Sequence, residues 1–200
     1  MAERIVLING LPGSGKTTLA TALAAELAVP LISKDAIKEA LAAAVPQVPA
    51  AALGRTASEL MWTLAAAVPG GVVLESWWFR PRDLAFVREG LGRTGARQVV
   101  EVWCDVPGEV ARERYVQRAR PAFYEDERHL AESWGRWLAE AAPLGLSLEL
   151  RVRTDLAVDI PGLARAVARL HELARAAAEV PDETQNGGPN ETQSGSPNET

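Results

Sequence analysis

A glycine-rich segment near the N-terminus constrains the fold of this chain more than any other feature. Residues 10–17 read GLPGSGKT and match the pattern G-x-x-x-x-G-K-[ST]. The apolar run over residues 4–9 predicts a buried strand before this segment, and residues 17–27 predict a helix after it. A strand, such a loop and a helix in that order are typical of a phosphate-binding loop. The sequence therefore predicts a site for a nucleoside triphosphate.

Each part of the loop has an expected role in binding phosphate. Glycines let the backbone N–H groups point toward an anion, and the following helix adds the positive end of its dipole. The Lys16 side chain is expected to reach the β- and γ-phosphates, and the Thr17 hydroxyl to bind Mg²⁺. The predicted nucleotide-binding residues of the loop are Gly10, Leu11, Pro12, Gly13, Ser14, Gly15, Lys16, Thr17 and Thr18.

Length and composition favour one globular domain followed by a polar tail. The chain has 200 residues, of which 48% are hydrophobic and 24% charged, values typical of a globular protein with a complete core. Near the C-terminus, ETQNGGPN at 183–190 recurs as ETQSGSPN at 191–198. So polar a repeat cannot bury enough apolar surface to fold. We expect a domain over residues 1–180 and a disordered tail over residues 181–200.

The charge balance argues against a dedicated nucleic-acid binder. The formal net charge is −5, and residues 181–200 carry four acidic and no basic side chains, which leaves about −1 for residues 1–180. A near-neutral domain lacks the broad basic surface that nucleic-acid binding requires. A small molecule is therefore the expected partner.

Hydropathy and cysteine content favour a cytoplasmic protein. No apolar run reaches the roughly 18 residues of a membrane span, and the N-terminus lacks the layout of a signal peptide. The single cysteine, Cys104, lies in an apolar run and is expected to pack inside a strand. We expect no membrane contact and no intramolecular disulfide.

The order of apolar segments predicts a doubly wound α/β domain with a parallel sheet. Strands are expected over 4–9, 29–33, 72–75, 98–104 and 146–152, and helices over 17–27, 35–44, 54–68, 81–91, 107–118, 130–141 and 160–178. Strands that alternate with helices imply right-handed crossovers and helices on both faces of the sheet. Ligands of such sheets bind at the carboxyl ends of the strands.

Two carboxylates follow predicted strands at this edge. Asp35 comes after the second strand, where it can accept the proton of a hydroxyl that attacks the γ-phosphate. Its alternative role is a helix cap, for which Ser33 also qualifies. Glu75 ends the third strand and is a candidate for Mg²⁺ or for the acceptor. The Trp77-Trp78 pair that follows either lines an acceptor pocket or is simply buried.

Arginines after the fourth strand are candidates for phosphate binding. Arg114 and Arg118 lie four residues apart on one face of a predicted helix, and Arg120 follows in a segment that resembles a lid. Guanidinium groups stabilise the charge on a transferring phosphoryl group. The alternative is a solvated helix face balanced by acidic neighbours. The two histidines, His129 and His171, are too far apart in the chain to suggest a zinc site.

Three motifs together resemble a known kinase family. They are the loop at Gly10–Thr18, the sequence Ser33-Lys34-Asp35, and Cys104-Asp105-Val106-Pro107 leading to Arg114-x-x-x-Arg118. Over residues 3–175 the chain resembles the P-loop kinases of the chloramphenicol phosphotransferase, polynucleotide 5′-kinase and zeta-toxin type, and more distantly the gluconate and shikimate kinases.

The resemblance implies a site that uses ATP with Mg²⁺ and a sheet with strand order 2-3-1-4-5. It makes Asp35 the base that activates the acceptor, and Arg114 and Arg118 lid residues that contact phosphate. Adenine is expected near Thr154 and Asp155. Glu75 stands where the family commonly has Asp.

Three functions are consistent with these features. The first is transfer of phosphate from ATP to a hydroxyl of a small molecule such as an antibiotic, a sugar or a nucleoside-like metabolite. The second is a polynucleotide 5′-hydroxyl kinase, which requires a basic groove that the charge balance does not favour. The third is a non-catalytic ATP-binding module, which would release no ADP in response to an acceptor.

Overall fold

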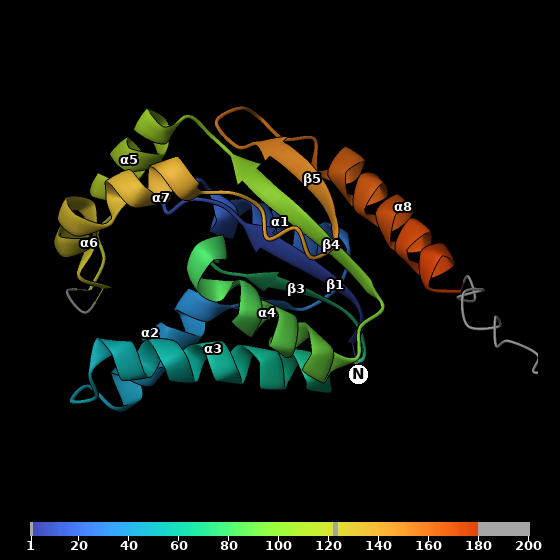
Figure 1. The fold of residues 1–200 in the computed structure, drawn as a ribbon, viewed down its shortest axis with the longest axis horizontal. Helices are drawn as coiled ribbons and strands as arrows, with labels where there is room; N and C mark the ends of the chain where they lie inside the picture. The colour runs from blue at the N-terminus through green and yellow to red at the C-terminus, as the bar shows by residue number, and fades with distance from the viewer. Residues whose placement is uncertain (1, 122–123, 180–200) are drawn as a thin grey trace, which may run out of the picture.

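Five parallel strands form one sheet at the centre of the molecule (Figure 1). The computed structural model describes residues 2–121 and 124–179. The strands are β1 (Ala2–Asn9), β2 (Leu31–Ser33), β3 (Gly70–Glu75), β4 (Gln98–Asp105) and β5 (Leu148–Arg153). Their order across the sheet is β2-β3-β1-β4-β5, which confirms the predicted doubly wound fold and its 2-3-1-4-5 strand order.

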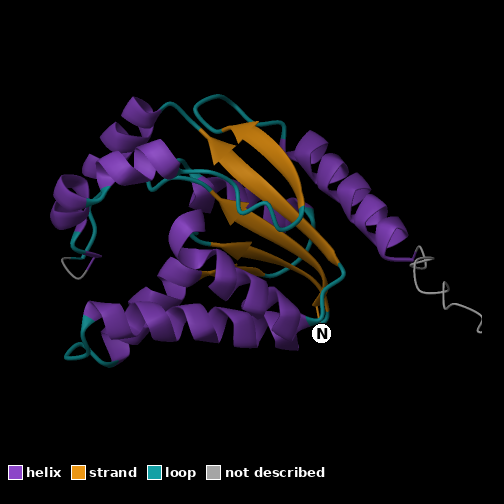
Figure 2. Cartoon of the chain, viewed as in Figure 1, coloured by secondary structure: helices purple, strands orange, loops and turns teal. Residues whose placement is uncertain are grey.

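Helices cover both faces of this sheet (Figure 2). One face packs against α1 (Lys16–Glu26) and α8 (Ile160–Glu179). The other packs against α3 (Ala50–Ala67) and α4 (Arg80–Thr94), and α2 (Lys34–Ala44) lies against α3. Covered in this way, the inner strands of the sheet are shielded from water on both faces, whereas the edge strand β5 stays partly exposed.

The central strand β1 shows how the sequence produces two cores. Val6 and Ile8 are buried in the core formed with α1 and α8, whereas Ile5 and Leu7 are buried in the core under α3 and α4. Successive side chains of a strand point to opposite faces, so a strand buried on both sides is apolar at every position. The uninterrupted run Ile-Val-Leu-Ile is therefore a buried strand, as predicted.

A third group of helices lies beyond the carboxyl ends of the strands. It consists of α5 (Gly108–Val116), α6 (Asp126–Glu132) and α7 (Trp134–Glu140). A smaller apolar cluster that includes Tyr115 and Trp137 holds these helices against the start of α4. They cover the edge of the sheet at which the phosphate loop begins (Figure 1).

The helix predicted over residues 130–141 is wrong, because the structure has two shorter helices there. α6 ends at Glu132 and α7 begins at Trp134, with Ser133 between them at φ −117°. The break accompanies a change in packing, since α6 has no buried residue whereas Trp134 and Trp137 of α7 are buried. Packing of the aromatic side chains overrides the helical pattern of the sequence here.

The prediction that Ser33 or Asp35 caps α2 is confirmed only in the position of Ser33. Ser33 occupies the N-cap position, yet its side chain makes no capping hydrogen bond, and Asp35 lies inside the first turn. The Ser33 hydroxyl instead donates to Glu75 at 2.6 Å. The Ser33 and Glu75 side chains therefore meet at the edge of the sheet where the candidate site lies.

Two further expectations concern the C-terminal tail and membrane-spanning segments. The tail predicted over residues 181–200 lies outside the described residues, so the boundary at residue 180 stays a prediction. Among residues 2–121 and 124–179, no helix has both the length and the apolar character that crossing a bilayer requires.

Candidate functional site

The phosphate loop connects β1 to α1 and depends on glycine at defined positions. Gly13 and Gly15 have φ of +82° and +85°, in the left-handed region that favours glycine. A Cβ atom on Gly13 would lie 2.1 Å from the Ala111 carbonyl oxygen of α5. The loop therefore packs against α5 so closely that a side chain at position 13 has no space.

Lys16 begins α1 and lies within the loop. Its side chain is 7% exposed, and its ammonium donates a hydrogen bond to the Leu11 carbonyl at 2.9 Å. Burial lowers the pKa of this lysine, while the nearby Glu75 carboxylate acts in the opposite direction. A buried ammonium beside inward-facing backbone groups suits a polyphosphate, whose charge would compensate the desolvation of Lys16.

Glu75 of β3 accepts hydrogen bonds from hydroxyl groups of two other elements, α1 and β2. One carboxylate oxygen accepts a hydrogen bond from Thr17 at 3.4 Å, and the other accepts one from Ser33 at 2.6 Å. The Glu75 side chain is only 3% exposed. The register of the parallel strands brings these groups together, because Glu75 pairs with Ile8 of β1 on one side and with Ser33 of β2 on the other.

This donor set fits Mg²⁺ bound together with phosphate. Mg²⁺ prefers oxygen ligands and is usually held by one or two carboxylates, substrate phosphates and waters. The Thr17 hydroxyl and the Glu75 carboxylate offer such ligands. Across residues 2–121 and 124–179, no group of three or more His, Cys, Asp or Glu side chains is arranged to hold a metal by itself.

Asp35 is paired with an arginine from a distant part of the chain. Its carboxylate accepts a hydrogen bond from Arg120 at 2.5 Å, and the same guanidinium lies 3.7 Å from Asp126. The Arg120 guanidinium also lies 3.9 Å from the centre of the Tyr124 ring, and the Tyr124 hydroxyl donates to Glu39 of α2 at 2.9 Å. The segment after α5 is thus joined to α2 across the site.

The other two predicted arginines come from α5. Arg114 donates to the Thr154 carbonyl at 3.3 Å, and the Thr154 hydroxyl donates to the Ser14 carbonyl of the loop at 2.5 Å. Arg118 is exposed, and within the described residues its guanidinium has no hydrogen bond or ion pair. The predicted lid residues therefore lie beside the loop, together with the position expected for adenine.

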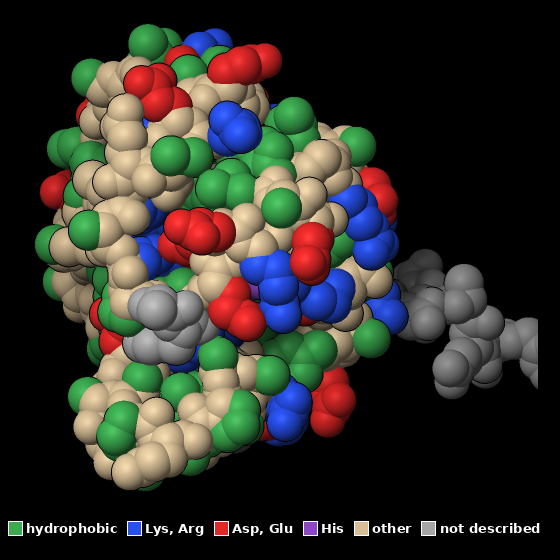
Figure 3. All heavy atoms as spheres, turned by 90° about the vertical axis from the view of Figure 1, so that its left-hand side faces the viewer, with side chains coloured by type: hydrophobic (Ala, Val, Ile, Leu, Met, Phe, Trp, Pro, Cys, Tyr) green, Lys and Arg blue, Asp and Glu red, His purple; other side chains and the backbone are tan. Residues whose placement is uncertain are grey.

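One pocket of about 320 Å³ unites most of the predicted residues. Figure 3 shows the end of the molecule to which the strands point, where Lys and Arg side chains gather. The predicted residues that line the pocket are Pro12, Gly13, Gly15, Lys16, Thr17, Thr18, Asp35, Glu75, Arg114, Arg118 and Arg120. Gly10, Leu11 and Ser14 are buried and do not line it.

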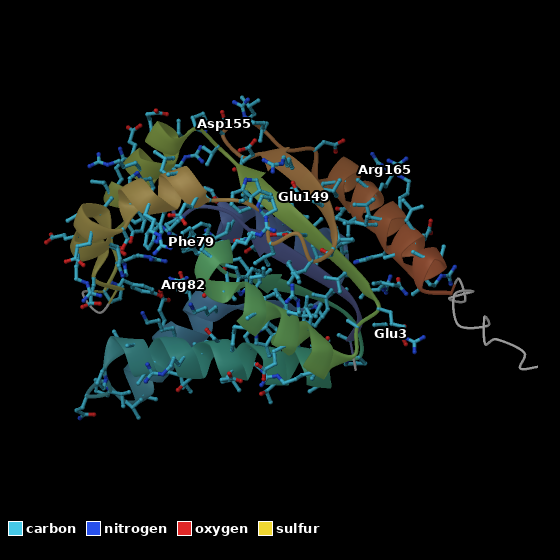
Figure 4. All side chains as sticks on the ribbon, in the orientation of Figure 1. Glu3, Phe79, Arg82, Glu149, Asp155 and Arg165 are labelled. Atoms are coloured by element: carbon cyan, nitrogen blue, oxygen red, sulfur yellow. The ribbon has the colours of Figure 1, made fainter. Side chains whose placement is uncertain are left out.

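Sequence reasoning missed part of the pocket wall. Lys34, Lys38, Arg82, Tyr124 and Asp126 line it although no role was predicted for them. The place of Lys34 directly before Asp35, after a strand, was a usable signal. The others carry no local motif. In Figure 4, the labels on Phe79 and Arg82 mark the start of α4 at this end of the sheet.

The adjacent tryptophans Trp77 and Trp78 differ in environment: one lines the pocket and the other is buried, the two alternatives that the sequence left open. Trp77 lines the pocket, with its ring centre 6.1 Å from that of Trp137. Trp78 is 3% exposed and stacks on Trp62 in the core under α3 and α4. Of the histidines, His129 lines the pocket and His171 of α8 hydrogen bonds to the Ile5 carbonyl, so the two do not share a site.

Comparison with solved structures shows the same architecture in several kinases. A Chloroflexus aurantiacus protein described as a candidate kinase is 22% identical, with a TM-score of 0.66 over 84% of this chain and 98% of its own. The Mycobacterium tuberculosis APS kinase, solved with AMPPNP and APS, is 21% identical, with a TM-score of 0.57 over 84% and 97%. A Sinorhizobium meliloti gluconokinase is 19% identical, with a TM-score of 0.55 over 88% and 96%. Such identities establish a shared fold.

Comparison at the level of sequence identifies the family. A search among curated proteins found no match. The model of the family described as an AAA domain matches residues 5–144, which include the phosphate loop, most of β1, and all of β2, β3 and β4. Because the match covers more than half of the chain, the protein belongs to this AAA domain family and has a P-loop kinase-like fold.

Proposed function

We propose that the protein is an ATP-dependent kinase that transfers the γ-phosphoryl group to a hydroxyl of a small molecule. One observation carries the proposal: Lys16 and Thr17 of the phosphate loop line the same pocket as the Asp35 carboxylate. A kinase needs a polyphosphate site and a group that receives the acceptor proton within one enclosure. The fold shared with proteins named as kinases, one of them solved with AMPPNP, supports the same conclusion.

Asp35 is the proposed general base. The acceptor oxygen forms a bond to the γ-phosphorus as the bond to the oxygen of departing ADP breaks, and the hydroxyl proton passes to the Asp35 carboxylate. Arg120 already donates to one oxygen of this carboxylate, so the acceptor hydroxyl either binds the other oxygen or replaces the guanidinium. In the second case Arg120 is free to bind phosphate, as expected for a lid arginine.

The remaining residues bind and orient. When bound, ATP supplies the phosphoryl group and Mg²⁺ neutralises charge on its oxygens. Thr17 and Glu75 are the proposed ligands of the metal, and Ser33 holds Glu75 in place. Lys16, Arg114 and Arg118 are the proposed cations that stabilise the transferring group from two sides.

The class of acceptor is the finer part of the proposal. An antibiotic, a sugar or a nucleoside-like metabolite fits the expected small pocket, in keeping with the chloramphenicol phosphotransferase type that the motifs resemble. A 5′-hydroxyl oligonucleotide is the alternative acceptor. We place the catalytic domain in residues 1–180.

Acceptor-dependent ADP production tests this proposal. The full chain is incubated with ATP and Mg²⁺, together with a panel of hydroxyl-bearing metabolites and a 5′-hydroxyl oligonucleotide. We expect a small molecule to stimulate ADP release, and the Lys16→Ala variant to abolish that stimulation. Stimulation by the oligonucleotide alone would assign the acceptor to nucleic acid. ATP binding without any stimulated release would leave a non-catalytic binding module.

A further inference from the structure

The charged side chains that line the pocket differ in whether they have an ion-pair partner. Arg82 forms two hydrogen bonds with the carboxylate of Asp83, at 2.7 and 2.8 Å. Arg120 is held by Asp35, as described above. Asp35 and Asp83 are therefore already engaged by arginines, which leaves Lys34 of α2 as the lysine to consider at this end of the pocket.

The Lys34 side chain lines the pocket and is partly buried, and within residues 2–121 and 124–179 its ammonium forms no hydrogen bond or ion pair. Arg118 also lacks an ion pair within those ranges, but it differs from Lys34 in being exposed. Burial is the largest cause that lowers the pKa of Lys34, while Asp35 is the carboxylate that most opposes the shift. A partly desolvated ammonium without an anion is unfavourable, and an anionic ligand would remove that penalty.

The place of Lys34 points to the acceptor, not to the nucleotide. Lys34 is the first residue of α2, adjacent to Asp35, and the charges that affect it include Arg82 and Asp83 at the start of α4. The cations beside the loop are different residues, Lys16 and Arg114. An anion bound to Lys34 would sit next to the proposed base and close to the aromatic wall formed by Trp77.

We propose that the phosphate acceptor is itself an anion, a hydroxy acid or a hydroxyl-bearing phosphate ester, whose anionic group binds the Lys34 ammonium. The inference rests on the kinase function proposed above and specifies its acceptor. Contact with Lys34 would orient the hydroxyl toward Asp35, and the Trp77 ring would pack against the carbon skeleton. The positive charge at Lys34 also offsets repulsion between this anion and the polyphosphate.

Calorimetry on the nucleotide-loaded protein tests the anion site without knowledge of the acceptor. The full chain is first saturated with Mg²⁺ and AMPPNP, so that the phosphate loop is filled, and is then titrated with inorganic phosphate, acetate or glycerol. We expect one of the two anions to bind and glycerol not to bind. Tighter binding of phosphate would indicate a phosphate ester, and equal or tighter binding of acetate a carboxylate.

Variants at position 34 assign the site to one side chain. Lys34→Gln is expected to lower the affinity for the anion about tenfold, which corresponds to loss of one charged hydrogen bond. Lys34→Arg should restore most of the affinity. Arg93→Gln also removes one positive charge, but its arginine pairs with Glu59 on an exposed surface, so binding should stay within about twofold of the wild type.

The outcomes separate this inference from the function on which it rests. Failure of AMPPNP to bind would overturn the proposed kinase function. AMPPNP binding with no anion binding, or with equal anion binding in Lys34→Gln, would overturn only the anionic acceptor. Turnover supplies a second check, since glycerate or glycerol 3-phosphate should be a better acceptor than glycerol. Faster ADP production with the neutral compound would contradict the inference.

Discussion

The two ends of the pocket are built in different ways. The nucleotide end is one contiguous segment, residues 10–18, in which backbone conformation and the buried Lys16 ammonium create the site. The proposed acceptor end is assembled from side chains of separate elements, such as Asp35 of α2 and Trp77 after β3, with Arg120 contributed by the segment that follows α5. A backbone-built site is fixed by the fold, whereas a side-chain-built site varies while the fold is kept.

This difference separates two kinds of substitution. Changes in the loop act on nucleotide binding and on folding together, because the loop packs directly on α5. Changes at the acceptor end should act on turnover or on acceptor affinity and leave the nucleotide site intact. The fold can therefore keep one donor chemistry while it accommodates different acceptors.

Lys16→Ala should have the largest effect, because Lys16 provides the positive charge at the centre of the loop. We expect phosphoryl transfer to fall by about 10³-fold and nucleotide affinity by at least about tenfold. The measurements are steady-state ADP production and displacement of a fluorescent ATP analogue, with thermal unfolding as the control for folding. Retained turnover would remove the loop from the mechanism.

Asp35→Asn should have the next largest effect and should act only at the acceptor end. Loss of the general base is expected to lower acceptor-dependent turnover about 100-fold while ATP affinity changes by less than about twofold. Glu39→Gln is the matched control one turn along α2, where the carboxylate bonds to Tyr124 and not to the acceptor. Normal turnover of Asp35→Asn would reduce Asp35 to the ion-pair partner of Arg120.

The two adjacent tryptophans should separate binding from stability. Trp77→Leu is expected to raise the KM for the acceptor about tenfold, because Trp77 lines the pocket. Trp78→Leu should instead lower the free energy of unfolding by about 2 kcal/mol and leave KM nearly unchanged, because Trp78 is buried against Trp62. Initial rates and urea unfolding measure the pair. The reverse pattern would break the proposed division of roles.

Thr154→Val should have the smallest effect, at the nucleotide end. The Thr154 hydroxyl supports the loop through the Ser14 carbonyl, so its removal should cost about 1 kcal/mol of stability and about threefold in nucleotide affinity. Thr63→Val is the matched control, since that hydroxyl donates to the Glu59 carbonyl on the exposed side of α3. Equal nucleotide affinity in both variants would show that Thr154 does not support the loop.

The nucleotide end and the sheet could be predicted from sequence because their determinants are local. The loop motif is contiguous, and the apolar strands alternate with helices along the chain, so the predicted fold class agrees with the structure. The strand order, which the family resemblance implied, agrees as well. Glu75 could be placed at the pocket edge because it ends an apolar strand. Its contacts with Thr17 and Ser33 required the register of three strands.

The acceptor end could be predicted only in part because its contacts join distant residues. Asp35 meets Arg120 across 85 positions in the chain, and Glu39 meets Tyr124 across 85 as well. No local pattern encodes such contacts. Adjacent positions also diverge, since Trp77 lines the pocket and Trp78 enters the core. The direction in which the chain leaves β3 decides this difference, and sequence periodicity does not report it.

Titration of the wild-type protein with ATP in millimolar Mg²⁺, followed by calorimetry, tests the central claim most directly. We predict binding at one site per chain and loss of the heat signal in Lys16→Ala. Absence of heat with every purine triphosphate would contradict the account, because the loop would then hold no polyphosphate for Asp35 to act beside.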